Sequence, residues 1–133
     1  HKKTSNGSKA FRPSLRLAVY LREGLACVWC GQAIEDGIQL SMDHVIPESK
    51  GGTHGAENIV SACHRCNSVR QDRSAESFAL ACALYVNGGQ TAEAILAHIR
   101  HQLALPLAPY RAEAREMLTR RGTVPAALAA QRR

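Results

Sequence analysis

The spacing of apolar residues predicts a helix near the beginning of the chain. Ser14 follows Pro13 and is placed to cap a helix that continues to about Arg22, and Gly24 is placed to end it. The side chains expected on its buried side are those of Leu17, Val19, Tyr20 and Leu21. Residues 1–12 are polar and basic, so we expect them to form a disordered arm.

The next apolar runs are short, and they predict a hairpin followed by a helix. Residues 40–46 and 58–61 are expected to form two strands, separated by a glycine-rich loop at residues 50–55. A helix is expected to begin near Cys63 and to continue past Arg70. The predicted order is therefore strand, loop, strand, helix.

From Ser74 onward the sequence becomes rich in alanine and leucine at helical spacing. One helix is expected to reach a break at residues 87–89, a second to begin at Thr91 and end before residues 106–109, and a third to follow. The positions expected on or beside the buried faces of the three helices are Phe78, Leu80, Cys82, Leu84 and Tyr85; Ile95, Leu96, Ile99 and Leu103; and Tyr110, Ala114, Met117 and Leu118.

Together these patterns predict an α+β fold with three regions. The disordered arm at residues 1–12 is followed by a small core at residues 13–73, and a helical extension at residues 74–133 is expected to pack on that core. The chain has 133 residues, which is the length of one domain or of a small domain with an extension.

Charge and hydropathy indicate which kinds of binding partner and which cellular compartment to expect. Lys and Arg number 17 against 11 for Asp and Glu, and the resulting net charge of +6 favours a polyanionic partner without identifying one. No apolar run approaches the roughly 20 residues of a membrane span, and no secretory signal is visible. We therefore expect no membrane partner and a reducing, cytoplasmic compartment.

Two Cys-x-x-Cys pairs, Cys27/Cys30 and Cys63/Cys66, have the spacing of a tetrahedral zinc site. In a chain without a secretory signal, this spacing indicates metal binding before disulfides. Four protein ligands leave no position for a substrate, so the Zn²⁺ would be structural and its binding energy would stabilise the fold. The alternatives are two chance pairs or a redox dithiol. Cys82 lies on an apolar helix face and is expected to be an inert buried thiol.

Polar residues between the cysteine pairs are the candidates for chemistry. Asp43 and His44 are adjacent in the first predicted strand, where neighbours point to opposite faces, so they can share a site only if the strand bends. Asn58 opens the second strand, and Asn67 follows Cys66 directly. A carboxylate and an amide oxygen suit a hard cation such as Mg²⁺. The alternative is that Asp43, His44 and Asn58 are ordinary turn residues.

Five motifs follow one another in this part of the chain. They are Cys27-x-x-Cys30, Asp43-His44-Val45-Ile46-Pro47, Gly51-Gly52, Asn58-Ile59-Val60 and Cys63-x-x-Cys66-Asn67. Together they resemble the HNH endonuclease family, in its zinc-bearing subgroup with two Cys-x-x-Cys pairs. The resemblance covers roughly residues 18–72. It implies a ββα-metal core, in which a hairpin packs on a helix around one divalent ion.

The resemblance also implies a role for each matching residue. His44 would be the general base that activates water, and Asp43 and Asn67 would bind a catalytic ion, Mg²⁺ or Mn²⁺ or another divalent ion. Asn58 would tie the hairpin together and orient the base. Many relatives have histidine where this chain has Asn67, which leaves the preferred metal open. The implied reaction is hydrolysis of a DNA phosphodiester bond to leave a 5′-phosphate and a 3′-hydroxyl.

Basic side chains near the predicted core are candidates for contact with DNA phosphates, with solvated surface charge as the alternative. These side chains are Lys50, Arg65, Arg70 and Arg73. Three further histidines, His54 in the glycine-rich loop and His98 and His101 in a predicted helix, are not expected to be catalytic. Trp29 lies between Cys27 and Cys30, in a turn that we call the zinc turn. It is expected to pack on this turn rather than to stack on a nucleic-acid base.

Three functions remain open from the sequence. The first is a metal-dependent DNA endonuclease whose helical extension docks substrate or a second subunit, as a homodimer or in a larger assembly. The second is a non-catalytic zinc module that binds nucleic acid. The third is an interaction platform at residues 74–121, with the zinc core as scaffold. Sequence specificity, nicking against double-strand cleavage, a phage or mobile-element origin, and a role in restriction, packaging, homing or defence also stay open.

Overall fold

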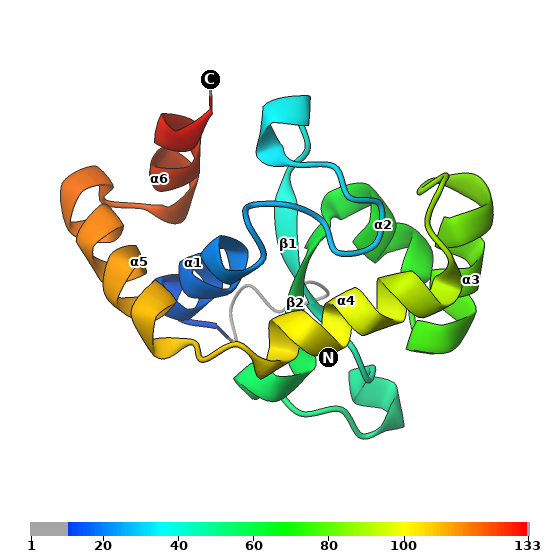
Figure 1. The fold of residues 1–133 in the computed structure, drawn as a ribbon. Coiled ribbons are helices and arrows are strands. Elements are labelled where there is room, and N and C mark those ends of the chain that lie inside the picture. Colours follow the sequence, from blue (N-terminus) through cyan, green and yellow to red (C-terminus); the bar gives the residue numbers. More distant parts are fainter. Residues whose placement is uncertain (1–10, 133) are drawn as a thin grey trace.

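The computed structural model describes residues 11–132, and within this range it contains six α-helices and one two-stranded sheet. The helices are α1 (Pro13–Arg22), α2 (His64–Arg70), α3 (Ala75–Tyr85), α4 (Ala92–Ala104), α5 (Ala108–Arg121) and α6 (Val124–Gln131), and the strands are β1 (Leu40–His44) and β2 (Ile59–Cys63). Figure 1 shows the hairpin in the middle, between α1, α5 and α6 on its left and α2 and α3 on its right. The predicted α+β fold is confirmed. None of the described helices is long and apolar enough to cross a membrane.

The hairpin and the helix that follows it form the centre of the fold. β1 and β2 are antiparallel, and His44 at the end of β1 is paired with Ile59 at the start of β2. β2 passes directly into α2, because Cys63 is the N-cap of α2 and its sulfur accepts a hydrogen bond from the backbone N–H of Cys66 at 3.3 Å. The predicted order of strand, loop, strand and helix is confirmed. β1 ends two residues earlier than predicted, and β2 begins one residue later and ends two residues later.

Two buried apolar clusters lie on opposite sides of the hairpin. The first contains Trp29, Val60 and Phe78 and includes residues of α3 and α4. The second contains Met42 and Ile59 and includes residues of α1, α5 and α6. Ile59 and Val60 belong to different clusters because successive residues of a strand point to opposite faces. The hairpin is therefore covered by helices on both faces.

The helix boundaries follow capping chemistry. Ser74 and Thr91 begin α3 and α4 as predicted, and each hydroxyl accepts a hydrogen bond from the backbone N–H three residues later, at 3.1 and 3.0 Å. The predicted cap at Ser14 is wrong, because α1 already begins at Pro13 with Arg12 as its N-cap. Proline has the fixed φ of a first helical residue and lacks the N–H that a cap would satisfy.

The outer side of α3 is more exposed than its apolar sequence suggests. Phe78 and Cys82 are buried as predicted, but Tyr85 is 81% exposed, and Leu80 and Leu84 are exposed as well. α3 packs mainly against α4, so only one face of the helix is covered. The expectation that Tyr85 lies inside is therefore wrong.

Only the last two residues of the predicted N-terminal arm lie in the described part of the chain. Residues 1–10 and 133 lie outside the described residues, so the predicted disorder can be compared only at residues 11 and 12. Phe11 is 5% exposed and belongs to the second cluster, so the predicted arm is too long by at least that residue. The helices after residue 74 contact the rest of the fold: α5 packs along α1, and the side-chain amide of Gln102 in α4 donates to the carbonyl of Arg22 at 2.8 Å.

Candidate metal and catalytic site

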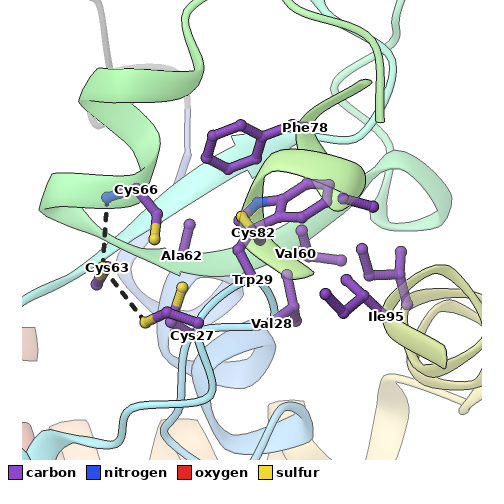
Figure 2. Packing of buried hydrophobic residues seen from close by; sticks show 13 residues of the cluster. Cys27, Val28, Trp29, Val60, Ala62, Cys63, Cys66, Phe78, Cys82 and Ile95 are labelled. Carbon is purple, nitrogen blue, oxygen red and sulfur yellow. Dashed lines mark hydrogen bonds between the residues drawn. The ribbon is translucent and has the colours of Figure 1, made fainter. Parts of the chain in front are cut away.

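Four sulfur atoms from three separate segments meet in one buried cluster. Cys27 and Cys30 lie in the turn after α1, Cys63 ends β2, and Cys66 lies in the first turn of α2. The four sulfurs lie within 4.8 Å of one another, and those of Cys30 and Cys63 are 3.9 Å apart. A tetrahedral Zn²⁺ with bonds near 2.3 Å would separate its sulfur ligands by about 3.8 Å. The cluster therefore fits a zinc ion, and Figure 2 shows Cys27, Cys63 and Cys66 at one end of the first apolar cluster, to which the four cysteines belong.

The sulfur cluster is buried, as a structural metal site requires. All four of its cysteines are buried, with exposed fractions of 7% or less. Hydrogen bonding from the thiol of Cys27 lowers the pKa of Cys63 to about 6 and that of Cys30 to about 2, while the pKa of Cys27 is raised, mainly by its hydrogen bond to Cys30, and that of Cys66 is raised as well. The thiolate form that zinc binds is therefore favoured at Cys30 and Cys63. Cys82 is buried outside the cluster, where burial raises its pKa to about 11, as expected for an inert thiol.

Trp29 links the zinc turn to the hairpin. Its ring is fully buried and packs edge-on against Phe78, with 5.0 Å between the ring centroids. Its indole Nε1–H donates to Oδ2 of Asp43 at 2.7 Å. The side-chain amide of Asn87 donates to the carbonyl of Trp29 at 2.9 Å. Trp29 is buried with the zinc turn as predicted, and it also holds the carboxylate of Asp43.

Arg70 holds Asp43 in a buried ion pair. Nη1 of Arg70 lies 3.0 Å from Oδ2 of Asp43, and the two side chains are 0% and 7% exposed. The same guanidinium donates to the carbonyl of His44 at 2.9 Å and to the carbonyl of Val45. Burial raises the pKa of Asp43, while the charge of Arg70 and the hydrogen bond from Trp29 act in the opposite direction and favour the carboxylate. This arrangement joins α2 to the end of β1.

The burial of Arg70 corrects one prediction about DNA contacts. A side chain with no exposed surface does not reach a phosphate, so Arg70 is a structural residue in this fold. Lys50, Arg65 and Arg73 are exposed. The guanidinium of Arg73 lies over the ring of Phe78, with 5.6 Å between Cζ and the ring centroid. These three side chains remain candidates for phosphate contact.

His44 faces the glycine-rich loop and the second apolar cluster. Its Nε2 lies 2.9 Å from Nδ1 of His54, and its ring centroid lies 5.9 Å from that of Phe11. Burial lowers the pKa of His44, and the carboxylate of Glu48 acts in the opposite direction. His44 is therefore mainly neutral near pH 7, which is the form that can accept a proton.

Asn58 closes the loop between the strands. Its Oδ1 accepts a hydrogen bond from the backbone N–H of Ile46 at 2.8 Å, and its Nδ2 donates to the carbonyls of Ile46 and Thr53 at 3.0 and 2.9 Å. Gly52 packs against the carbonyl of Ile46, and a Cβ at position 52 would lie 1.7 Å from that oxygen. Asn58 thus makes the kind of contact that the family resemblance implies, and the loop accepts only glycine at position 52.

Asn67 lies on the same side of β1 as Asp43. Its Nδ2 donates to Oγ of Ser41 and to the carbonyl of Met42, both at 2.9 Å. Ser41 and Asp43 are two residues apart in the strand and so share a face. Among residues 11–132, Oδ1 of Asp43 and Oδ1 of Asn67 accept no hydrogen bond. One oxygen of each side chain is therefore left for an ion.

The structure brings Asp43 and Asn67 to one face of β1 and places His44 on the other. The expected bend that would bring Asp43 and His44 together is absent, because His44 is still paired with Ile59 in the ladder. Arg70 explains this difference. Its hydrogen bonds to Oδ2 of Asp43 and to the carbonyl of His44 fix the backbone of β1 from the side of α2.

Sequence reasoning does not find three neighbours of His44. His54 and Glu48 each offer a nitrogen or oxygen atom within 4.8 Å of His44, and Phe11 covers both imidazole rings. The available signals were weak. They were a histidine in the loop that follows β1 and a single aromatic residue at the end of a polar segment.

Comparison with known proteins gives two matches, one to a family model and one to a curated protein. Residues 27–79 match the family model described as HNH endonuclease. A stretch of 50 residues, 37% of this chain, is 38% identical to the CRISPR-associated endonuclease Cas9 of Corynebacterium diphtheriae and covers 4% of that protein. No solved structure matches the chain. The predicted resemblance to the HNH endonuclease family is thus confirmed for the segment that carries the sulfur cluster, the hairpin and α2.

Proposed function

We propose that this chain is a metal-dependent endonuclease that hydrolyses phosphodiester bonds in DNA. The observation that supports this most directly is the placement of His44, a half-buried imidazole at the end of β1, beside a loop that Asn58 closes. The match to HNH endonucleases supports nuclease chemistry in this segment. The net charge of +6 suits a polyanionic substrate.

In this proposal His44 is the general base. Because burial lowers its pKa, the ring is neutral near pH 7 and can take a proton from water. The water oxygen then attacks phosphorus, and the bond between phosphorus and the 3′ oxygen breaks. The 3′ oxygen takes up a proton from solvent, which leaves a 3′-hydroxyl and a 5′-phosphate. A base of this kind contributes roughly 10²–10⁴-fold to the rate.

Asp43 and Asn67 are the proposed ligands of a catalytic divalent ion. Each has one side-chain oxygen that accepts no hydrogen bond within residues 11–132, and oxygen donors suit Mg²⁺ or Mn²⁺. Because the structure places His44 on the other face of β1, the ion can act on the same phosphate as His44 only if the strand bends, and it would then supply positive charge that stabilises the phosphate and the leaving oxygen. Arg70 occupies the other oxygen of Asp43, so the ion pair and the ion would use different atoms of the carboxylate.

A non-catalytic, zinc-containing module that binds nucleic acid is the second candidate. The observation in its favour is that Asp43 and His44 lie on opposite faces of β1. Such a module would bind DNA through exposed basic side chains, with Lys50, Arg65 and Arg73 as the candidates. Its affinity would fall as the salt concentration rises, because phosphate contacts release counterions.

A plasmid assay distinguishes the two candidates. Zinc-loaded protein is incubated with supercoiled plasmid and either Mg²⁺ or Mn²⁺, and nicked and linear products are measured over time. We expect the wild type to cut and His44→Ala to cut roughly 10²–10⁴-fold more slowly. The matched control is His98→Ala, an exposed histidine in α4 that is expected to cut at the wild-type rate. Thermal unfolding shows whether both variants are folded.

The outcomes separate clearly. Equal rates for the wild type and a folded His44→Ala variant would exclude His44 as the base. Plasmid binding without cleavage by any divalent ion would favour the non-catalytic module. Cleavage by the wild type that disappears in His44→Ala, with His98→Ala unchanged, would support the endonuclease.

A further inference from the structure

We propose that His54 and Glu48 are positioning residues for His44, which hold its ring in one orientation with Nε2 protonated and the Nδ1 lone pair free for water. This role rests on the proposed function of His44 as a base. It assigns a purpose to two residues of the loop after β1 that neither the motif pattern nor the family resemblance identifies.

The three side chains form a chain through both nitrogens of His54. Nδ1 of His54 lies 2.9 Å from Nε2 of His44, and Nε2 of His54 lies 2.9 Å from Oε2 of Glu48. Each separation is that of a hydrogen bond. Because the two contacts use opposite sides of the His54 ring, the arrangement is linear: carboxylate, imidazole, imidazole.

With His54 neutral, the proton positions are set from the carboxylate end. An ionised Glu48 can only accept, so Nε2 of His54 must carry the hydrogen in that contact. Nδ1 of a neutral His54 then has a lone pair, and Nε2 of His44 must be the donor in the second contact. The remaining nitrogen of His44, Nδ1, is left with its lone pair. It makes no hydrogen bond within residues 11–132, so it is the nitrogen from which water can be activated.

The hydrogen-bonded side chains of Glu48, His54 and His44 pack against Phe11 on one side and are exposed to solvent on the other. The ring of Phe11 packs against both imidazoles, with centroid distances of 5.9 Å to His44 and 5.6 Å to His54, and Phe11 itself is buried. The side chains of His54 and Glu48 are 51% and 55% exposed. The backbone carbonyl of Thr53, the residue before His54, accepts a hydrogen bond from Asn58 at 2.9 Å.

The three side chains also offer one ligand atom each, all within 4.8 Å of one another, so a bound metal ion is the alternative to this hydrogen-bonded arrangement. A metal ion bound by all three side chains would need one nitrogen of His54 to point at the ion together with the atoms of His44 and Glu48. Here one nitrogen of His54 faces His44 and the other faces Glu48. A carboxylate at the end of the chain also stabilises the positive charge that His44 gains when Nδ1 takes up a proton, while the hydrogen on Nε2 stays in place.

Nitrogen NMR of the imidazoles tests the proposal without reference to cleavage. Zinc-loaded protein with ¹⁵N-labelled histidine, free of other divalent ions, should show His44 with a protonated Nε2 and a bare Nδ1, and with a slowly exchanging proton on Nε2. His54→Ala should abolish that slow exchange. His54→Asn should preserve it, because the side-chain oxygen of asparagine can take the place of Nδ1 as acceptor. His98→Ala is the control and should leave the His44 signals unchanged.

Kinetics give the second readout. We expect His54→Ala to lower kcat by about tenfold with little change in KM, His54→Asn to recover most of that loss, and Glu48→Ala to fall between the two. A wild-type His44 with Nδ1 protonated, or a slowly exchanging proton that survives in His54→Ala, would overturn the proposal. So would stoichiometric binding of added Zn²⁺ to His44, His54 and Glu48.

The two proposals fail in different ways. If His44→Ala still cuts DNA, the base assignment fails, whatever the NMR spectra show. If His44→Ala is inactive but His54→Ala changes neither the spectra nor kcat, the positioning role fails and the base assignment stands.

Discussion

At the scale of single residues, the loop after β1 is shaped by one close contact. A Cβ at Gly52 would lie 1.7 Å from the carbonyl oxygen of Ile46 and 2.8 Å from Nδ2 of Asn58. These are the two groups whose hydrogen bonds close the loop. The neighbouring Gly51 is different, because it has φ +91° but no atom within 4 Å of an added Cβ. One glycine is required by space and the other by backbone conformation.

This difference predicts unequal effects of the same substitution. Gly52→Ala should lower the free energy of unfolding by about 3 kcal/mol or more, because backbone atoms must move apart. Gly51→Ala should lower it by about 1–2 kcal/mol, the cost of left-handed backbone for alanine. Urea unfolding of zinc-loaded protein measures both values. Equal losses in the two variants would show that the contact with Ile46 does not control the loop.

Single residues also show how far the sequence predicts the site. The four cysteines of the sulfur cluster were predicted correctly because their spacing is a local property of the chain, while the roles of Asn58 and His44 stay predictions. The burial of Arg70 was not found, because an arginine near a basic surface and an arginine paired inside the fold look alike in sequence. His54 was missed for a related reason: its contact with His44 depends on the path of a loop whose hydrogen bonds no periodicity reveals.

At the scale of elements, the sulfur cluster joins three segments of the fold, together with hydrogen bonds such as the one that the backbone N–H of Val28 donates to the carbonyl of Ser61 at 3.1 Å. The turn after α1, the end of β2 and the first turn of α2 each contribute to it, and Cys63 also caps α2. α2 has only seven residues, a length at which an isolated helix is not stable in water. We therefore expect the position of Asn67 and Arg70 on α2 to depend on the sulfur cluster, together with the ion pair of Arg70 and Asp43.

Loss of the metal should consequently unfold the centre of the protein. We expect Cys63→Ser to lose zinc and most of its thermal stability, since zinc binding contributes on the order of 10 kcal/mol in model peptides. Cys82→Ala is the matched control, a buried cysteine outside the cluster that should cost about 1 kcal/mol. Thermal unfolding with and without EDTA, together with zinc analysis, checks this. Wild-type stability that is unaffected by EDTA would contradict a structural role.

Elements were predicted best where several signals agreed. The starts of α3 and α4 combine a capping hydroxyl with helical spacing, and both were located correctly at Ser74 and Thr91. The outward position of Tyr85 was not foreseen, because apolar spacing marks every apolar face of a helix, whether or not a neighbouring element covers it. Which face is covered is decided by the contact between α3 and α4.

At the scale of the whole molecule, the hairpin contributes one face to each of the two apolar cores. Val60 and Ala62 of β2 point into the cluster that holds Trp29, while Ile59 of β2 and Met42 of β1 point into the cluster covered by α1, α5 and α6. Neither core can be lost without exposing one face of the hairpin. The helices after residue 104 therefore stabilise the strand that carries His44, although they lie far from the zinc turn in sequence.

This arrangement predicts that a destabilising substitution in α5 also lowers the stability of the first core, which contains Trp29. Met117 is 3% exposed in the second core, and Met117→Ala should lower the free energy of unfolding by about 2–4 kcal/mol. The only tryptophan, Trp29, lies in the first core and reports on that side through its fluorescence. We expect its unfolding transition in urea to shift together with the circular dichroism signal of the helices. Glu113→Ala, an exposed change on the same helix, should shift neither. A Met117→Ala variant whose helical signal is lost early while Trp29 keeps its wild-type transition would mean that the two cores unfold independently.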